Sequence, residues 1–282
     1  MNNDIDISVN EIIEKTEKEI HYKNSRDEIF RRGNSWIYCY NTFKEYSNKQ
    51  AYDEKDYDFL ALNLSFYLAS WGMYRGSSFL LNMDYKIHIE AVKMMMKEKY
   101  RQLFDGNIYQ NKSEYKKLLF GEENFDGIYV WLNDYYTNIH NIMKSTGDTE
   151  ISDTLITKIL LGVYGCIPAF DRFFKDAFGL FGGQKHLSTN GNAITNKNKG
   201  LLAILETELG NEIQNWGSND IPYMKKVDMY FYSLGEVMSK NATEAAKASN
   251  KKPTQKDIDD ALKEIKKALQ TKIEEKYIKP IA

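Results

Sequence analysis

The sequence predicts an all-α fold. Apolar residues recur along most of the chain at helical intervals of three and four, and segments that alternate at period two are scarce. Only four prolines occur in 282 residues, which suits long helices better than many short strands. We therefore expect a compact multi-helix globular protein, either undivided or arranged as two helical lobes with a cleft between them.

The first two helices are predicted from capping and periodicity. Ser8 and Glu11 have the spacing of a capping box, and apolar residues follow them at helical intervals. A second helix is predicted over residues 26–46, where aromatic and aliphatic side chains recur with the same period.

A third helix, over residues 56–81, is apolar on almost every side, as is typical of a helix enclosed by others. Gly72 and Gly76 would share one face of it, where another backbone can approach or the helix can bend. Arg75 is the only charged residue between positions 59 and 83. A buried arginine must be paired or reach solvent. Arg75 is therefore either half of a structural ion pair or a cationic group at the floor of a cleft.

Eight more helices are predicted, and Pro168, Pro222 and Pro253 each stand where one of them would start. They cover residues 85–104, 113–119, 125–144, 151–164, 168–180, 200–216, 222–239 and 254–277. The last helix carries an apolar stripe. We expect that stripe to dock on the rest of the chain rather than on a partner helix, because a stripe of so few heptads does not specify a coiled-coil partner.

The helical pattern breaks at residues 182–200, which are rich in Gly, Asn and Lys and predict a long exposed loop. The loop contains Lys185, Lys197 and Lys199 and no acidic residue. Lysines also prevail from Lys240 onward. We accordingly divide the chain into a globular body, 1–239, and a basic linker with a C-terminal amphipathic helix, 240–282.

Charge and cysteine usage exclude several classes of protein. A net charge of −2 argues against a wholly basic nucleic-acid coat protein. Cys39 and Cys166 lie far apart, so we expect neither a disulfide framework nor a cysteine-based zinc site. The first residues lack the basic start and apolar run of a signal peptide, and the most apolar stretch carries polar residues that would be costly in lipid. We expect a cytoplasmic protein that does not span a membrane.

Motifs for metal and nucleotide chemistry are missing from the sequence. None of the four histidines falls in an HxxxH or HExxH arrangement, and there is no GxxxxGK[ST], strand-linked GxGxxG or GxSxG. We therefore predict neither a metal ion nor an organic cofactor.

The most informative segment spans residues 151–180. Lys158 lies in an apolar helix, and Asp171 follows in the first turn of the next one. Taken singly, Lys158 is explained as a snorkelling lysine and Asp171 as a charge that complements the helix dipole.

Together, Thr157, Lys158, Pro168 and Asp171 resemble the catalytic hairpin region of the helix-hairpin-helix DNA glycosylases, most closely their 8-oxoguanine-glycosylase-like bacterial branch. In that family a Ser/Thr-Lys pair opens an apolar helix and a Pro-x-x-Asp closes the motif. This chain departs from the pattern in that residues 152–155 replace the glycine-containing hairpin. Residues 149–240 form the catalytic-like segment. Asp228, in a second stretch that looks like the aspartate helix of such enzymes, is the alternative carboxylate.

The resemblance implies a DNA glycosylase-like enzyme that cleaves the N-glycosidic bond of a damaged or modified base. Asp171 would stabilise positive charge on the sugar, and Lys158 would be the nucleophile that forms a Schiff base. The partner would be double-stranded DNA with the target base flipped out of the stack. The role would be repair or defence against modified viral DNA.

Substrate contacts are expected from two groups of residues. The pocket would contain Trp71 and Arg75, and the loop lysines 185, 197 and 199 would contact phosphates. The alternative is a non-catalytic all-α interaction protein, in which Lys158, Asp171 and Arg75 are structural charges.

Overall fold

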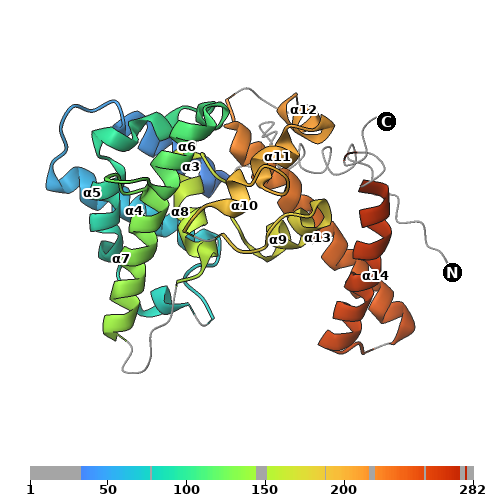
Figure 1. The fold of residues 1–282 in the computed structure, drawn as a ribbon. Coiled ribbons are helices and arrows are strands. Elements are labelled where there is room, and N and C mark those ends of the chain that lie inside the picture. The colour runs from blue at the N-terminus through green and yellow to red at the C-terminus, as the bar shows by residue number, and fades with distance from the viewer. Residues whose placement is uncertain are drawn as a thin grey trace.

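The computed structural model describes residues 33–76, 78–143, 151–187, 189–215, 220–250, 252–273 and 277. This part of the chain is all-α, as predicted, and contains no strand beyond an isolated bridge between Glu122 and Phe125 (Figure 1). The helix predicted after Ser8 and the first part of the one predicted from residue 26 lie outside the described residues. No helix in the described ranges is long and apolar enough to cross a membrane.

The helices follow the predicted order, although the predicted segments 85–104 and 200–216 each divide into shorter pieces. The α-helices are α3 (Gly33–Tyr46), α4 (Glu54–Ser70), α5 (Ile89–Met95), α6 (Lys112–Phe120), α7 (Ile128–Met143), α8 (Asp153–Tyr164), α9 (Arg172–Phe178), α10 (Asn192–Thr195), α11 (Leu201–Leu205), α12 (Glu208–Gln214), α13 (Tyr223–Ser249) and α14 (Gln255–Ile273). The 3-10 helices are η1 (Phe79–Asn82), η2 (Tyr85–His88), η3 (Glu98–Phe104), η4 (Ile108–Gln110) and η5 (Gly179–Phe181).

Helix α8 is the centre around which the first half of the chain packs. It contacts α3, α4 and α7, and all of its residues from Leu155 to Tyr164 are buried. Trp36 of α3 donates its indole N–H to the Leu161 carbonyl at 2.9 Å. The helix ends at Gly165, whose φ of +63° is left-handed, and a Cβ at that position would lie 2.8 Å from Pro222 Cγ. Gly165 thus permits both the turn and the close approach of the segment before α13.

In the second half of the chain, α9 and α14 both pack on α13 (Figure 1). Ile265, Leu269 and Ile273 of α14 are buried, as is Tyr277 beyond its end. The predicted docking of the C-terminal stripe on the rest of the chain is therefore confirmed.

The helix predicted to end at Ser239 continues to Ser249. Ala242 and Ala246 are buried and extend its apolar stripe by two more turns. The first residues of the predicted basic linker are therefore helical.

The segment 182–200 is not the wholly exposed loop that its composition predicts. It contains the short helix α10, and Leu187, Ala193 and Ile194 in it are buried. These three apolar residues anchor it to the protein. Its lysines remain exposed, as expected.

The prediction for the apolar helix 56–81 is wrong at its C-terminal end, because α4 stops at Ser70. Gly72 has a φ of +79°, so the backbone leaves the helical conformation there. Gly72 and Gly76 therefore do not share a helical face. Arg75 therefore lies on an exposed turn and is not a buried charge. Its side chain folds over Gly72, where a Cβ would lie 2.6 Å from Arg75 Nε.

Candidate active site

Two lysine–aspartate pairs lie beside Trp71. Lys158 Nζ is 3.3 Å from Asp171 Oδ2, and Lys225 Nζ is 2.7 Å from Asp228 Oδ2. The two ammonium groups lie 5.2 Å and 5.4 Å from the centre of the Trp71 ring, so both make cation–π contacts with one indole. We call these five residues the lysine–aspartate site.

The site forms where separate parts of the fold converge. Lys158 comes from the middle of α8, Asp171 precedes α9, and Lys225 and Asp228 stand one turn apart near the start of α13. Trp71 belongs to the turn that ends α4. The α3 helix adds Trp36, whose ring centre is 5.1 Å from Lys225 Nζ.

Asp171 is held in place by hydrogen bonds to both carboxylate oxygens. It is the N-cap of α9, so Oδ1 accepts the backbone N–H of Phe174 at 3.1 Å while Oδ2 faces Lys158. The predicted helix start at residue 168 is therefore four residues too early. Thr157 explains part of this difference, because its hydroxyl accepts the Phe170 N–H at 2.9 Å and stabilises the non-helical turn before Asp171.

Asp228 is tied to the same turn from the opposite side. Its Oδ1 accepts the backbone N–H of Ala169 at 2.9 Å, and its Oδ2 accepts from Lys225. We did not single out Lys225 from the sequence. The available signal was the i, i+3 spacing of Lys225 and Asp228 on one face of a largely apolar helix.

The two lysine–aspartate pairs differ in how accessible they are to solvent. The exposed fractions of the side chains are 6% for Lys158 and 17% for Asp171, against 6% for Lys225 and 9% for Asp228. Unpaired charges at this depth would be very costly, so each pair neutralises itself. Of the four charged groups, the Asp171 carboxylate is the most accessible to a ligand.

A fully buried tyrosine lies near both carboxylates. Burial raises the pKa of the Tyr67 hydroxyl well above its ordinary value, and the nearby charges of Asp228 and Asp171 raise it further. Tyr67 therefore stays neutral at any physiological pH.

A third ion pair joins α8 to α9 outside this site. Lys175 Nζ lies 2.8 Å from Asp153 Oδ1, and the other oxygen of Asp153 accepts the Leu187 N–H at 2.9 Å. This pair links the same two helices as Lys158 and Asp171, but it makes no contact with Trp71 that the structure records. It is a natural structural control for the lysine–aspartate site.

The structure brings together some of the predicted site residues and separates others. Lys158, Asp171 and Trp71 meet, and the alternative carboxylate Asp228 is beside them. Arg75 lies on its exposed turn and forms no ion pair within the described ranges. Lys185 lines a neighbouring pocket, whereas Lys197 and Lys199 are exposed and outside its lining.

Comparison with protein-family models, curated proteins and solved structures finds no match to this chain. In the described ranges, no three His, Cys, Asp or Glu side chains gather so as to hold a metal ion. The chemical groups that the site does present are a carboxylate, an amine in contact with it, and an indole. Such a set can stabilise a developing cation, transfer a proton and stack on a planar ring.

Proposed function

We propose that this protein is a DNA glycosylase-like enzyme that cleaves the N-glycosidic bond of a damaged or modified base, in repair or in defence against modified viral DNA. The observation that carries the proposal is the 3.3 Å contact between Lys158 Nζ and Asp171 Oδ2 beside the ring of Trp71. These are the carboxylate and amine that the chemistry requires.

Asp171 would act on the sugar. Breaking the N-glycosidic bond leaves positive charge on the sugar ring, and a fixed carboxylate stabilises that charge without having to reorganise. The hydrogen bond from the Phe174 N–H fixes the carboxylate, and its 17% exposed fraction gives a substrate a route to it. The same group can orient an attacking water molecule.

Lys158 would act on the leaving base and then on the sugar carbon. Its ammonium group can give a proton to the departing base nitrogen, which leaves a neutral amine. That amine can attack the sugar carbon, forming a C–N bond as the positive charge moves to nitrogen. The bond from this carbon to the ring oxygen then breaks while one proton passes from the nitrogen to that oxygen, which gives the protonated Schiff base. If water attacks instead, the products are the free base and an abasic site.

Trp71 would receive the displaced base. A base that leaves the duplex stack must find an aromatic or apolar surface, and stacking on an aromatic side chain contributes about 1–3 kcal/mol. Trp71 is partly buried next to the reacting pair, so its position suits this role.

A second candidate function is a non-catalytic interaction protein. The observation that favours it is that both aspartates of the site already have a lysine partner and a backbone N–H donor. In this case the four charges only hold α8, α9 and α13 together.

The deciding experiment is base release from DNA duplexes that carry oxidised, alkylated, deaminated or bulky modified bases. Asp171→Asn keeps the N-cap hydrogen bond but removes the charge, so we expect base release to fall by orders of magnitude. Asp153→Asn is the matched control, because it weakens the other α8–α9 ion pair and should leave base release within a few-fold of the parent.

Three results would overturn the proposal. The first is that the parent protein releases no modified base above background. The second is that Asp171→Asn is as active as the parent. The third is that Asp153→Asn loses as much activity as Asp171→Asn, since the Asp171 carboxylate would then have only a structural role.

A further inference from the structure

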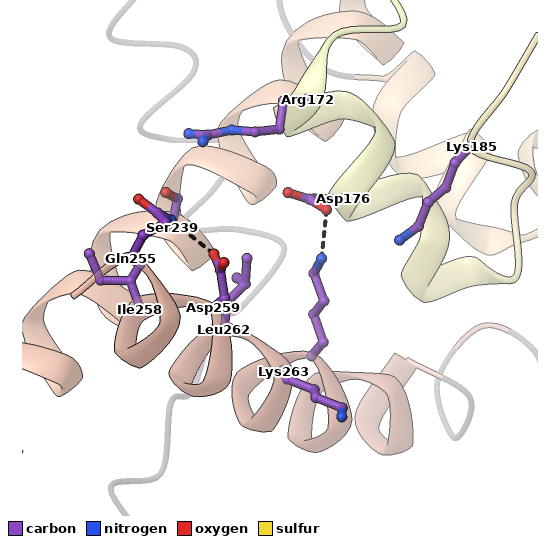
Figure 2. Close-up of a pocket in the computed structure, with 10 residues that line it drawn as sticks. Arg172, Asp176, Lys185, Ser239, Gln255, Ile258, Asp259, Leu262 and Lys263 are labelled. Carbon is purple, nitrogen blue, oxygen red and sulfur yellow. Dashed lines mark hydrogen bonds and ion pairs between the residues drawn. The ribbon is translucent and has the colours of Figure 1, made fainter. Parts of the chain in front are cut away.

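A pocket of about 470 Å³ opens beside the lysine–aspartate site, between α9, α13 and α14 (Figure 2). It begins at Arg172, the residue that follows Asp171. Arg172 and Asp176 stand four residues apart on one face of α9, and Ser239 reaches the pocket from α13. The remaining lining residues come from the loop after α9 and from α14: Lys185, Gln255, Ile258, Asp259, Leu262, Lys263 and Lys266.

The pocket has an excess of positive charge, since it is lined by four cationic side chains and two carboxylates. One carboxylate, Asp176, is neutralised by Lys266 at 2.6 Å. The other, Asp259, accepts a hydrogen bond from the Gln255 side chain at 2.9 Å. Arg172 and Lys185 form no ion pair within the described part of the chain.

Arg172 and Lys185 are two of the three lining cations that form no ion pair in the described ranges, and they approach the pocket from different elements. Figure 2 shows Lys185 reaching down from the loop after α9, with its ammonium group directed toward Asp176, and Arg172 extending from the start of α9 in a different direction. Both residues are exposed, so a ligand can reach them from solvent. Each of them can donate charge-assisted hydrogen bonds to an anion, and the Arg172 guanidinium can bind two oxygens at once.

We infer that this pocket binds backbone phosphates of the DNA strand that carries the target base. The inference rests on the proposed function, because it assigns the neighbouring site to DNA. The volume is within the range of small-ligand sites, roughly 300–1,000 Å³, which leaves room for a sugar–phosphate segment rather than a lone anion. Contacts of this kind fix the register of a protein on DNA, and here they would place the strand next to Asp171.

The docked C-terminal helix is part of this binding site. Helix α14 supplies Lys266, which cancels the charge of Asp176 and so prevents that carboxylate from repelling a phosphate. Lys185, which the sequence analysis expects to contact phosphates, would do so in this pocket. Arg172 joins it there, although the sequence analysis does not single it out.

The test is binding of an unmodified duplex, followed by fluorescence anisotropy over a series of salt concentrations. The variant is Arg172→Gln with Lys185→Gln. Each lost phosphate contact reduces the slope of log affinity against log salt by about 0.9, so we expect a slope shallower by up to about two and weaker binding at low salt. The control is Lys55→Gln with Lys116→Gln, which changes the net charge equally on α4 and α6, away from the pocket (Figure 1).

Asp176→Asn provides a second, opposite test. It removes a negative charge from the pocket and frees Lys266 to face the ligand, so binding should tighten several-fold. A residue that served only the fold would give no such gain, because breaking a partly buried ion pair destabilises the protein without adding affinity.

The inference is overturned if the pocket variant binds the duplex as the parent does, or if the control weakens binding equally. It is also overturned if inorganic phosphate alone protects the parent against thermal unfolding through Arg172 and Lys185 while duplex binding ignores both residues. Failure of the proposed function has a different signature, namely pocket-dependent duplex binding with no base release from any modified substrate.

Discussion

The carboxylate of Asp228 accepts a hydrogen bond from the backbone N–H of Ala169 at 2.9 Å, and so joins α13 to the turn that positions Asp171. The same carboxylate neutralises Lys225, which is 5% exposed. Asp228 is thereby assigned a positioning role, whereas Asp171 is the more accessible carboxylate.

Asp228→Asn should be strongly destabilising, because it can keep the hydrogen bond to Ala169 but leaves the Lys225 charge buried without its partner. Breaking one half of a buried ion pair costs about 3–5 kcal/mol. Urea denaturation measures the loss. The double variant Asp228→Asn with Lys225→Met removes both charges and should lose less than the single variant. Equal losses would show that the two side chains are not coupled.

Lys158→Gln should abolish any covalent protein–DNA adduct that borohydride can trap, because only an amine forms the Schiff base. Base release by water can survive in this variant. Lys175→Gln is the control, since it removes a partly buried lysine from the neighbouring α8–α9 ion pair. An adduct that persists in Lys158→Gln would assign the nucleophile to another amine.

His88 should make the protein less stable in mild acid. It is fully buried between the hydroxyl groups of Tyr74 and Tyr136, at 2.8 Å and 2.6 Å, and burial lowers its pKa from 6.5 to about 3. Between these values the unfolded chain binds a proton that the folded protein does not. The free energy of unfolding should therefore fall by about 1.4 kcal/mol for each pH unit below 6.5, with no contribution from His88 above that pH.

Urea denaturation at pH 7 and pH 5 checks this prediction against His88→Gln. The variant cannot take up the proton, so its stability should change less than that of the parent by about 2 kcal/mol over this range. Identical pH dependence of stability in the two proteins would show that His88 does not cause the loss of stability in mild acid.

Gly165→Ala should destabilise the protein more than Gly182→Ala. Both glycines have a left-handed φ, +63° and +75°, so either substitution brings backbone strain of about 1–2 kcal/mol. At Gly165 the new Cβ would also lie 2.8 Å from Pro222 Cγ, whereas at Gly182 it would meet no atom within 4 Å. Thermal melts of the two variants measure the difference. Equal melting temperatures would mean that the Pro222 segment moves aside without cost.

The sequence predicted those features that depend on local pattern. The periodicity of residues 151–164 and of the C-terminal stripe located α8 and α14. Lys158 and Asp171 were singled out from the sequence, and the structure brings them into contact. The end of α4 was missed because it depends on a single left-handed residue, Gly72, within an otherwise uniform apolar run.

Contacts between segments that are far apart in the chain could not be predicted from the sequence. Lys225 joins the site only because α13 packs on α9 and brings Asp228 to the Ala169 backbone. Arg172 and Lys185 share a pocket only because α14 folds back along α13. These are contacts between distant segments, and they leave no periodic signal in the chain.

Helix α13 fixes the distance between the lysine–aspartate site and the pocket. It carries Asp228 in the lysine–aspartate site and Ser239 in the pocket, which at 1.5 Å per residue are separated by about 16 Å along one uninterrupted helix. Duplex DNA advances about 3.4 Å per base pair, so that length matches about five base pairs. On the proposed function, the phosphate contacts would extend to one side of the modified base. A duplex with fewer than about five base pairs on that side would lose the contacts at the Ser239 end of the pocket while still reaching Asp171.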